Sequence, residues 1–159
     1  AFVEIDNLLK KHTNKEYILI FPFCSKKHPQ KKWPFFKDLI KKIIEIYKNK
    51  YSILISPGPG EIDEAKSFNT EIVLSDKKKP LNINQLITLI NNSSFVISND
   101  TGPAHICSHL NKKGLVLFGK HTSPEKVSIE KQNFEAISVQ DLNTLTVDTV
   151  IKKIKNSLN

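Results

Sequence analysis

Short apolar runs alternate with amphipathic stretches along almost the whole chain. The run Tyr17–Phe21 is apolar throughout and stops at Pro22, which is typical of a strand buried on both faces. From Pro34 to Tyr47 the apolar positions recur at spacings of three and four, which predicts an amphipathic helix with Pro34 in its first turn. The further predicted strands are 51–55, 71–74, 95–98, 115–118 and 134–138.

Helices are predicted between the later strands as well. Asn82 and Gln85 have the spacing of a capping box, so we expect a helix to open at Asn82. Three more are predicted over 61–68, 103–110 and 147–158. Strands that alternate with helices imply parallel pairing and right-handed crossovers. The predicted fold is therefore one Rossmann-like, doubly wound α/β domain over residues 17–159, with residues 1–16 as a linker or docking segment.

Ligands of such a sheet bind in the crevice at the carboxyl ends of the strands. The loops expected there are 22–33, 56–61, 98–103 and 119–125. In segment 98–105, Ser-Asn-Asp-Thr-Gly-Pro-Ala-His, a strand ends and a helix begins within four residues. A glycine there lets a ligand approach the backbone, and a proline suits the first helical turn. The free N–H groups and the positive end of the helix dipole would then bind a diphosphate.

Each candidate residue also has a purely structural interpretation. Asp100 or Thr101 would serve equally well as a simple helix cap. Lys31 and its neighbour in the sequence would neutralise phosphate oxygens or form a solvated charge run. Glu61 would accept hydrogen bonds from ribose hydroxyls, or sit in a first helical turn that the dipole favours. His105 would form a hydrogen bond back to the loop, reach a phosphate, or be structural. Trp33, which follows the two lysines, is expected to pack the lysine loop against the domain.

Composition narrows the classes of function. The 159-residue chain has a formal net charge of +8, and all 24 of its basic residues are lysine. The missing arginines disfavour a nucleic-acid partner, because lysine lacks the rigid guanidinium fork that reads bases and phosphates. Cys24 and Cys107 have no metal-ligand spacing and are interpreted as buried free thiols. We expect no metal site, and the sequence has no Walker-type loop and no Ser-His-Asp order.

Targeting signals are also missing from the sequence. No apolar run approaches the ~20 residues of a membrane span, and the first residues do not form a secretory signal. We therefore expect a cytoplasmic protein, with weak attraction of its lysines to anionic headgroups at the inner membrane surface. The chain begins with Ala and contains no Met, which favours a fragment of a longer protein.

Four segments in order resemble a known family. They are Lys-Lys-Trp-Pro at 31–34, the Pro-Gly-rich turn and its glutamate at 57–61, segment 98–105, and Leu-Phe-Gly with Thr-Ser-Pro-Glu at 117–125. Over residues 16–157 the chain resembles the C-terminal half of glycosyltransferase family 9, the bacterial heptosyltransferases of lipopolysaccharide core assembly. The resemblance implies a GT-B architecture, in which the C-terminal domain binds the nucleotide-sugar donor, typically ADP-heptose. The N-terminal domain, which this chain lacks, would supply the acceptor site and the catalytic base.

The resemblance also implies a set of donor-binding residues, while it places no catalytic residue, metal or cofactor in this chain. Lys31 would contact the diphosphate and Glu61 the ribose. The turn at 101–103 would form the phosphate-binding helix start, with Asp100 near the donor sugar and His105 supporting the loop. The implied set is Lys31, Glu61, Asp100, Thr101, Gly102, Pro103 and His105. The isolated chain would bind a donor without transferring sugar.

Two other functions fit parts of the pattern. Half of another GT-B enzyme, such as a sugar-nucleotide epimerase, would share the fold, but the Lys-x-Trp-Pro segment disfavours it. A non-catalytic nucleotide- or nucleic-acid-binding module would share the basic charge, but the chain offers no aromatic stacking face for nucleic acid. The sequence departs from the family at Phe23, where a glycine is usual, and at 120–122, where Pro-Thr is usual. Both positions fall in loops of the expected donor pocket, so the donor sugar stays open.

Overall fold

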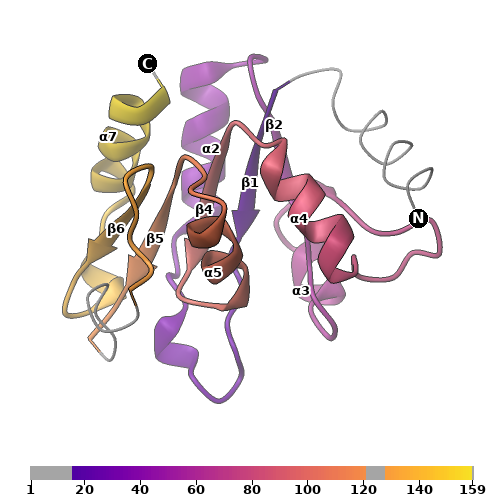
Figure 1. Ribbon diagram of the computed structural model, residues 1–159. Coiled ribbons are helices and arrows are strands. Elements are labelled where there is room, and N and C mark those ends of the chain that lie inside the picture. Colours follow the sequence, from indigo (N-terminus) through magenta and orange to yellow (C-terminus); the bar gives the residue numbers. More distant parts are fainter. Residues whose placement is uncertain (1–15, 121–127, 159) are drawn as a thin grey trace.

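The computed structural model describes residues 16–120 and 128–158, and Figure 1 shows their arrangement. The strands are β1 (Tyr17–Phe21), β2 (Ser52–Ile55), β3 (Glu71–Ile72), β4 (Phe95–Asn99), β5 (Gly114–Phe118) and β6 (Phe134–Ser138). The α-helices are α2 (Phe36–Tyr47), α3 (Ile62–Lys66), α4 (Ile83–Asn91), α5 (Gly102–His109) and α7 (Val147–Leu158). Two short 3-10 helices are η1 (Pro29–Lys31) and η2 (Leu142–Thr144). The predicted docking segment 1–16 lies, except for Glu16, outside the described residues.

The six strands form one parallel sheet in the order β3-β2-β1-β4-β5-β6. From β1 the chain adds β2 and β3 on one side, then crosses over to add β4, β5 and β6 on the other. The direction of winding therefore changes between β1 and β4, which pair with Ile18 opposite Phe95. The carboxyl ends at such a switch point diverge and leave a crevice for ligands. The predicted Rossmann-like, doubly wound fold is confirmed.

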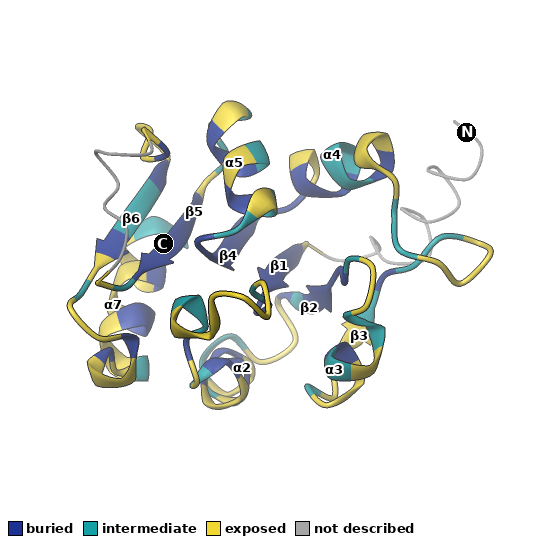
Figure 2. Cartoon of the chain, turned by 90° about the horizontal axis from the view of Figure 1, so that it is seen from below, coloured by how far each residue is buried: buried dark blue, intermediate teal, exposed yellow. Residues whose placement is uncertain are grey.

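Helices cover both faces of the sheet, as the view from below in Figure 2 shows: α4 and α5 lie on one side of the strands, and α2 and α3 on the other. Alternate residues of β1 point to opposite faces: Ile18 and Ile20 pack in the core under α2, α3 and α7, whereas Leu19 packs under α4 and α5. A strand buried on both faces must be apolar at every position, and all five residues of β1 are buried. Within the described residues, no helix is long and apolar enough to cross a membrane.

Most element boundaries agree with the sequence-based expectation. The capping box of α4 is present: the Asn82 backbone N–H donates to Gln85 Oε1 (3.0 Å), and the Gln85 N–H donates to Asn82 Oδ1 (2.9 Å). The start predicted for the helix after β1 was wrong, because Pro34 lies in a turn and α2 begins at Phe36. Trp33 is buried in the core immediately before this turn, and its burial fixes the backbone there. The chain therefore turns at residues 34–35 before the helix begins.

Candidate functional site

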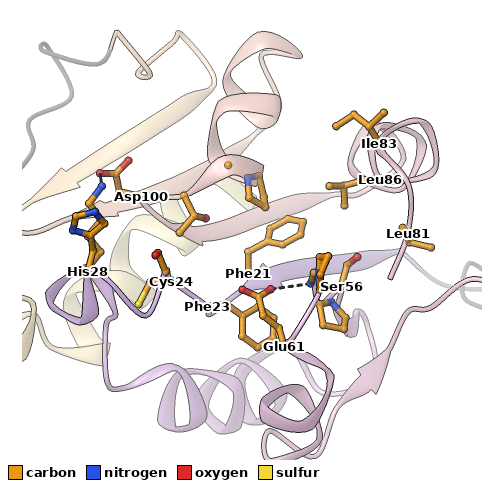
Figure 3. A pocket seen from close by; sticks show the side chains of 18 residues that line it. Phe21, Phe23, Cys24, His28, Ser56, Glu61, Leu81, Ile83, Leu86 and Asp100 are labelled. Carbon is orange, nitrogen blue, oxygen red and sulfur yellow. Dashed lines mark hydrogen bonds and ion pairs between the residues drawn. The ribbon is translucent and has the colours of Figure 1, made fainter. Parts of the chain in front are cut away.

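A cleft of about 560 Å³ lies at the carboxyl ends of β1, β2 and β4 (Figure 3). Residues from segments 21–31, 56–61, 81–86 and 100–103 line it. Three of these segments fall in loops that the strand order assigned to the crevice. The fourth expected loop, 119–125, lies mostly outside the described residues. The topology of the sheet thus gathers loops that are up to about 80 positions apart in the sequence, as expected at a switch point of a doubly wound sheet.

The cleft has two chemically different ends, which Figure 3 separates. At one end lie Asp100 and His28, together with Lys31; we call this the polar end. At the other lie Leu81, Ile83 and Leu86; we call this the apolar end.

Sequence reasoning missed the apolar end. Ile83 is 58% exposed, and among the described residues it is one of two large apolar side chains with such high exposure. The sequence did carry a signal for this end: apolar residues, Leu81 and Ile83, stand on both sides of the Asn82 cap, and the cap itself does not require them.

The start of α5 is open towards the cleft. Thr101 occupies the N-cap position with extended backbone (φ −145°, ψ 179°), but its side chain makes no capping hydrogen bond. Its hydroxyl instead lies 3.5 Å from the carbonyl oxygen of Asn99. Pro103 has no N–H, and the N–H of Ala104 donates back to the Thr101 carbonyl (3.0 Å). The Thr101 side chain therefore does not cap the positive end of the helix, where an anion is favoured.

Gly102 faces open space at this helix start. A Cβ built on Gly102 would meet no atom within 4 Å, and the residue is exposed. Its backbone is not in the left-handed region; among the described glycines only Gly60 is (φ 78°). The packing and backbone conformation of the protein therefore do not require glycine at this position, and the space beside it is open.

The two adjacent lysines of the loop after β1 have different partners. Lys31 Nζ lies 3.3 Å from Asp100 Oδ2 and lines the cleft. Lys32 Nζ lies 2.6 Å from Glu64 Oε2 of α3, outside the residues that line the cleft. The structure thus separates the pair and brings only Lys31 to the polar end.

Asp100 is the most buried charged group of the cleft. It is 6% exposed and directly follows β4. Removing a carboxylate from water is unfavourable unless an opposite charge or hydrogen bonds offset the cost, and the ammonium of Lys31 supplies part of that compensation. The pair leaves Lys31 close to the open start of α5, so positive charge gathers at the polar end beside one buried carboxylate.

Glu61 lies between the two ends of the cleft, as Figure 3 shows. It precedes α3, and its Oε1 accepts a hydrogen bond from the Gly58 backbone N–H at 2.8 Å. Burial raises the pKa of this carboxyl above its ordinary 4.5, and the Gly58 hydrogen bond opposes that rise. Its backward turn onto Gly58 holds the carboxylate at the cleft edge, where it remains available to accept further hydrogen bonds.

His105 is the predicted site residue that the structure does not bring to the cleft. It lies on an exposed face of α5 and is not among the lining residues. In residues 16–120 and 128–158, no hydrogen-bond partner is found for its side chain. The other six predicted site residues, Lys31, Glu61, Asp100, Thr101, Gly102 and Pro103, all line the cleft.

The cysteines and metal ligands complete the inventory of reactive groups. Cys107 is free and buried, so the interpretation as a buried free thiol is confirmed for it; burial raises its pKa to about 12. The same interpretation was wrong in part for Cys24, which is half-buried and lines the cleft. In the described part of the chain, no group of three or more histidine, cysteine or acidic side chains is placed to hold a metal ion.

Solved structures with this fold are known. Escherichia coli ADP-heptose LPS heptosyltransferase II is similar over 99% of this chain and 52% of its own, with 17% identity and a TM-score of 0.80. E. coli heptosyltransferase WaaC, solved with ADP, is similar over 96% and 48%, with 20% identity and a TM-score of 0.74. Methanocaldococcus jannaschii UDP-GlcNAc 2-epimerase is similar over 98% and 42%, with 18% identity and a TM-score of 0.68. This chain therefore spans about half the length of the heptosyltransferases it resembles.

At these identities the structural likeness establishes the fold, which the heptosyltransferases share with the epimerase. No curated protein sequence matches the chain. A family model does distinguish the two kinds of enzyme: the model of glycosyltransferase family 9 (heptosyltransferase) matches residues 4–154. This match covers nearly the whole chain, including all six strands. The chain belongs to glycosyltransferase family 9.

Proposed function

We propose that this chain is the donor-binding domain of a glycosyltransferase that transfers a sugar from an ADP-sugar to a lipopolysaccharide-type acceptor. Heptose is the sugar that we propose. The observation that carries the proposal is the open start of α5 beside Lys31 in the cleft at the switch point. An uncapped helix N-terminus and an adjacent ammonium are complementary to a diphosphate. Family membership, and the neighbour solved with ADP, support a nucleotide-diphosphate ligand.

The order of groups along the cleft matches the order of groups in a nucleotide. The apolar end would receive the base, against Leu81, Ile83 and Leu86. Glu61, between the ends, would accept hydrogen bonds from the ribose hydroxyls. The polar end would receive the diphosphate at Lys31 and the backbone of 101–103. A ligand laid along the cleft in this direction meets each wall with the complementary chemistry.

Transfer would proceed by attack of an acceptor hydroxyl on the anomeric carbon of the donor sugar, with the nucleoside diphosphate as leaving group. The bond from the anomeric carbon to the phosphate oxygen breaks, and negative charge grows on that oxygen. Lys31 and the N-terminus of α5 would stabilise this charge without a metal ion. Asp100, next to Lys31, would lie near the donor sugar. A general base from a separate acceptor domain would take the proton of the acceptor hydroxyl.

The proposed location is the cytoplasm, where nucleotide sugars are made, with the lysine-rich surface weakly attracted to anionic headgroups of the inner membrane. In this proposal the 159-residue chain binds the donor and transfers nothing by itself.

Isothermal titration of this chain with ADP tests the proposal. We expect binding of ADP, and no sugar transfer when ADP-heptose and a lipopolysaccharide-core acceptor are supplied. A chain that stays folded by circular dichroism but binds neither ADP nor ADP-heptose would contradict donor binding. Transfer by the chain alone would contradict the need for an acceptor domain.

A further inference from the structure

Asn99, the last residue of β4, holds the loop after β1 at two points. Its side chain is fully buried. Its Oδ1 accepts a hydrogen bond from the Trp33 backbone N–H at 3.1 Å, and its Nδ2 donates to the Phe23 carbonyl at 3.1 Å. The two anchored positions stand near the two ends of the loop. One amide group from a different strand therefore holds both ends of the loop by hydrogen bonds.

Among the described residues, few other contacts hold the loop between these points on the cleft side, apart from the ion pair of Lys31 with Asp100. Residues 25–30 are exposed, and the loop's only regular structure is the single turn of η1. On its far side, Trp33 Nε1 donates to the Leu145 carbonyl at 2.9 Å and the ring packs in the core. The position of Lys31, two residues before Trp33, therefore depends on how the backbone of Trp33 is fixed.

The two bonds require an amide at position 99. The Trp33 N–H needs an acceptor and the Phe23 carbonyl needs a donor, and an asparagine side chain supplies both. A carboxylate of the same shape can only accept, so it would place an oxygen against the Phe23 carbonyl. An alanine would leave both backbone groups buried without these partners. The orientation of the amide is fixed by this pair of partners.

The next residue along the strand acts on the same loop. Asp100 Oδ2 lies 3.3 Å from Lys31 Nζ, so consecutive residues after β4 hold the backbone of the loop and its ammonium group. The same strand end leads directly into the open start of α5. The ammonium and the helix start, which come from separate parts of the sequence, are thus set against each other by one short stretch of chain.

We propose that Asn99 is a positioning residue that sets Lys31 against the diphosphate site. The inference rests on the proposed function for the ligand, whereas the anchoring of the loop can be measured without one. Asn99 does not line the cleft, so it acts through the loop and not through contact with the nucleotide. Its loss should weaken binding of the diphosphate and leave binding of the nucleoside unchanged.

The test compares Asn99→Asp and Asn99→Ala with Ser93→Ala. Ser93 is a matched control, because it is also buried and its hydroxyl donates to the Ile90 carbonyl at 2.7 Å. It precedes the N-terminal end of β4, whereas Asn99 is at the C-terminal end. The first measurement is hydrogen exchange at the Trp33 backbone amide, in the absence of ligand. We expect exchange to accelerate about tenfold or more in Asn99→Ala, to accelerate less in Asn99→Asp, which keeps an acceptor for this amide, and to stay unchanged in Ser93→Ala.

The second measurement is titration with ADP and with adenosine. Asn99→Ala removes the anchor without adding a charge; it should weaken ADP binding about tenfold, as expected for a misplaced charge-assisted contact, and leave adenosine within about twofold. In the Lys31→Ala background, Asn99→Ala should cost no further ADP affinity, because the group that Asn99 positions is gone. A merely structural role would predict equal losses for ADP and adenosine and additive effects with Lys31→Ala.

Each result decides between the two claims. Unchanged Trp33 exchange in Asn99→Ala would overturn the anchor, whatever the ligand. Faster exchange with equal losses for both ligands would overturn the positioning of Lys31 and leave donor binding intact. A parent protein that does not bind ADP would overturn both the proposed function and the role of Asn99 at a diphosphate.

Discussion

Two helices begin at the same cleft, and their first turns are built in opposite ways. At α4, Asn82 and Gln85 satisfy each other's backbone N–H groups, so the helix start is closed by its own side chains. At α5, the N-cap side chain of Thr101 makes no such bond and Pro103 contributes no N–H. The closed helix presents apolar side chains to the cleft, and the open one presents backbone and dipole. A missing cap at a cleft is therefore informative when a neighbouring helix shows that the chain can build one.

The comparison also separates stability from binding. A capping box stabilises a helix by bonds made within the protein, so its loss should appear in the free energy of unfolding. An open helix start contributes less to folding and has its N-terminal charge available for a ligand. We therefore expect changes at α5 to alter ADP affinity, and changes at α4 to alter stability. Four predictions, from the largest effect on ADP binding to the smallest, test this division.

The largest effect is expected from Gly102→Val. A Cβ at Gly102 meets no protein atom within 4 Å, so the variant should fold normally. The added side chain would stand between the diphosphate and the helix start. ADP affinity should fall on the order of a hundredfold or more, equivalent to losing about two charge-assisted contacts, whereas adenosine affinity falls much less. Circular dichroism and titration with both ligands measure this. A folded variant that binds ADP as tightly as the parent would remove the diphosphate from this helix.

The second effect compares adjacent lysines. Lys31→Ala removes the ammonium at the polar end and leaves the Asp100 carboxylate less compensated, so ADP binding should weaken by about 1.5–3 kcal/mol. Lys32→Ala breaks a half-exposed pair with Glu64 outside the cleft and should change ADP binding by less than about 0.5 kcal/mol. Calorimetric titration of both variants decides the matter. Equal losses would show that net charge, and not the position of Lys31, attracts the nucleotide.

The third effect concerns Glu61 and pH. Its pKa is raised above 4.5 by burial, so the carboxylate gains its proton at a higher pH than an exposed one as the solution is acidified. Ribose hydroxyls donate best to the ionised form, so ADP affinity should fall as pH drops through this raised pKa. Glu61→Gln should weaken ADP binding about tenfold at neutral pH and remove the Glu61 contribution to the pH dependence.

The stability of the fold should respond to this group with the opposite sign. Because the folded-state pKa lies above the unfolded one, ionisation of Glu61 disfavours the folded state, and its contribution to stability declines as pH rises between the two pKa values. Titrations with ADP and 2′-deoxy-ADP across this pH range, with Glu61→Gln as the reference, test the ribose contact. An identical pH profile in parent and variant would exclude Glu61 from it.

The smallest effect on binding is expected from Asn82→Ala at α4. This variant loses the capping box and should lower the free energy of unfolding by about 1 kcal/mol. ADP affinity should stay within about twofold of the parent value, because Asn82 does not line the cleft. Urea unfolding and calorimetry measure the two quantities separately. A loss of ADP affinity larger than that of Lys31→Ala would contradict the division between the two helices.

The sequence pattern was sufficient for the fold and for most of the loops that line the cleft. A uniformly apolar strand such as β1, and the spacing of Asn82 and Gln85, carry their meaning within a few residues, so both were predicted correctly. The crevice loops followed from topology, which is why Gly102 and Lys31 were placed at one site before any geometry was known.

Contacts between distant segments could not be predicted. Asn99 accepts a hydrogen bond from Trp33, which is 66 positions away, and no local sequence pattern near either residue predicts this bond. The exposure of His105 and of Cys24 depends on where the helix and loop surfaces meet solvent, which periodicity does not give for an eight-residue helix or an irregular loop. The start of α2 was misplaced for the same reason, since the burial of Trp33 fixed the backbone before Pro34.

The backbone amide of Gly102, followed by nuclear magnetic resonance during titration with ADP and then with adenosine, tests the central claim most directly. The amide of Gln85 in the capped start of α4 serves as the internal reference. If the open start of α5 binds the diphosphate, the Gly102 signal shifts with ADP and stays in place with adenosine, while Gln85 responds alike to both. A Gly102 signal that is unmoved by saturating ADP, or that moves equally with adenosine, would contradict the assignment of the diphosphate to this helix.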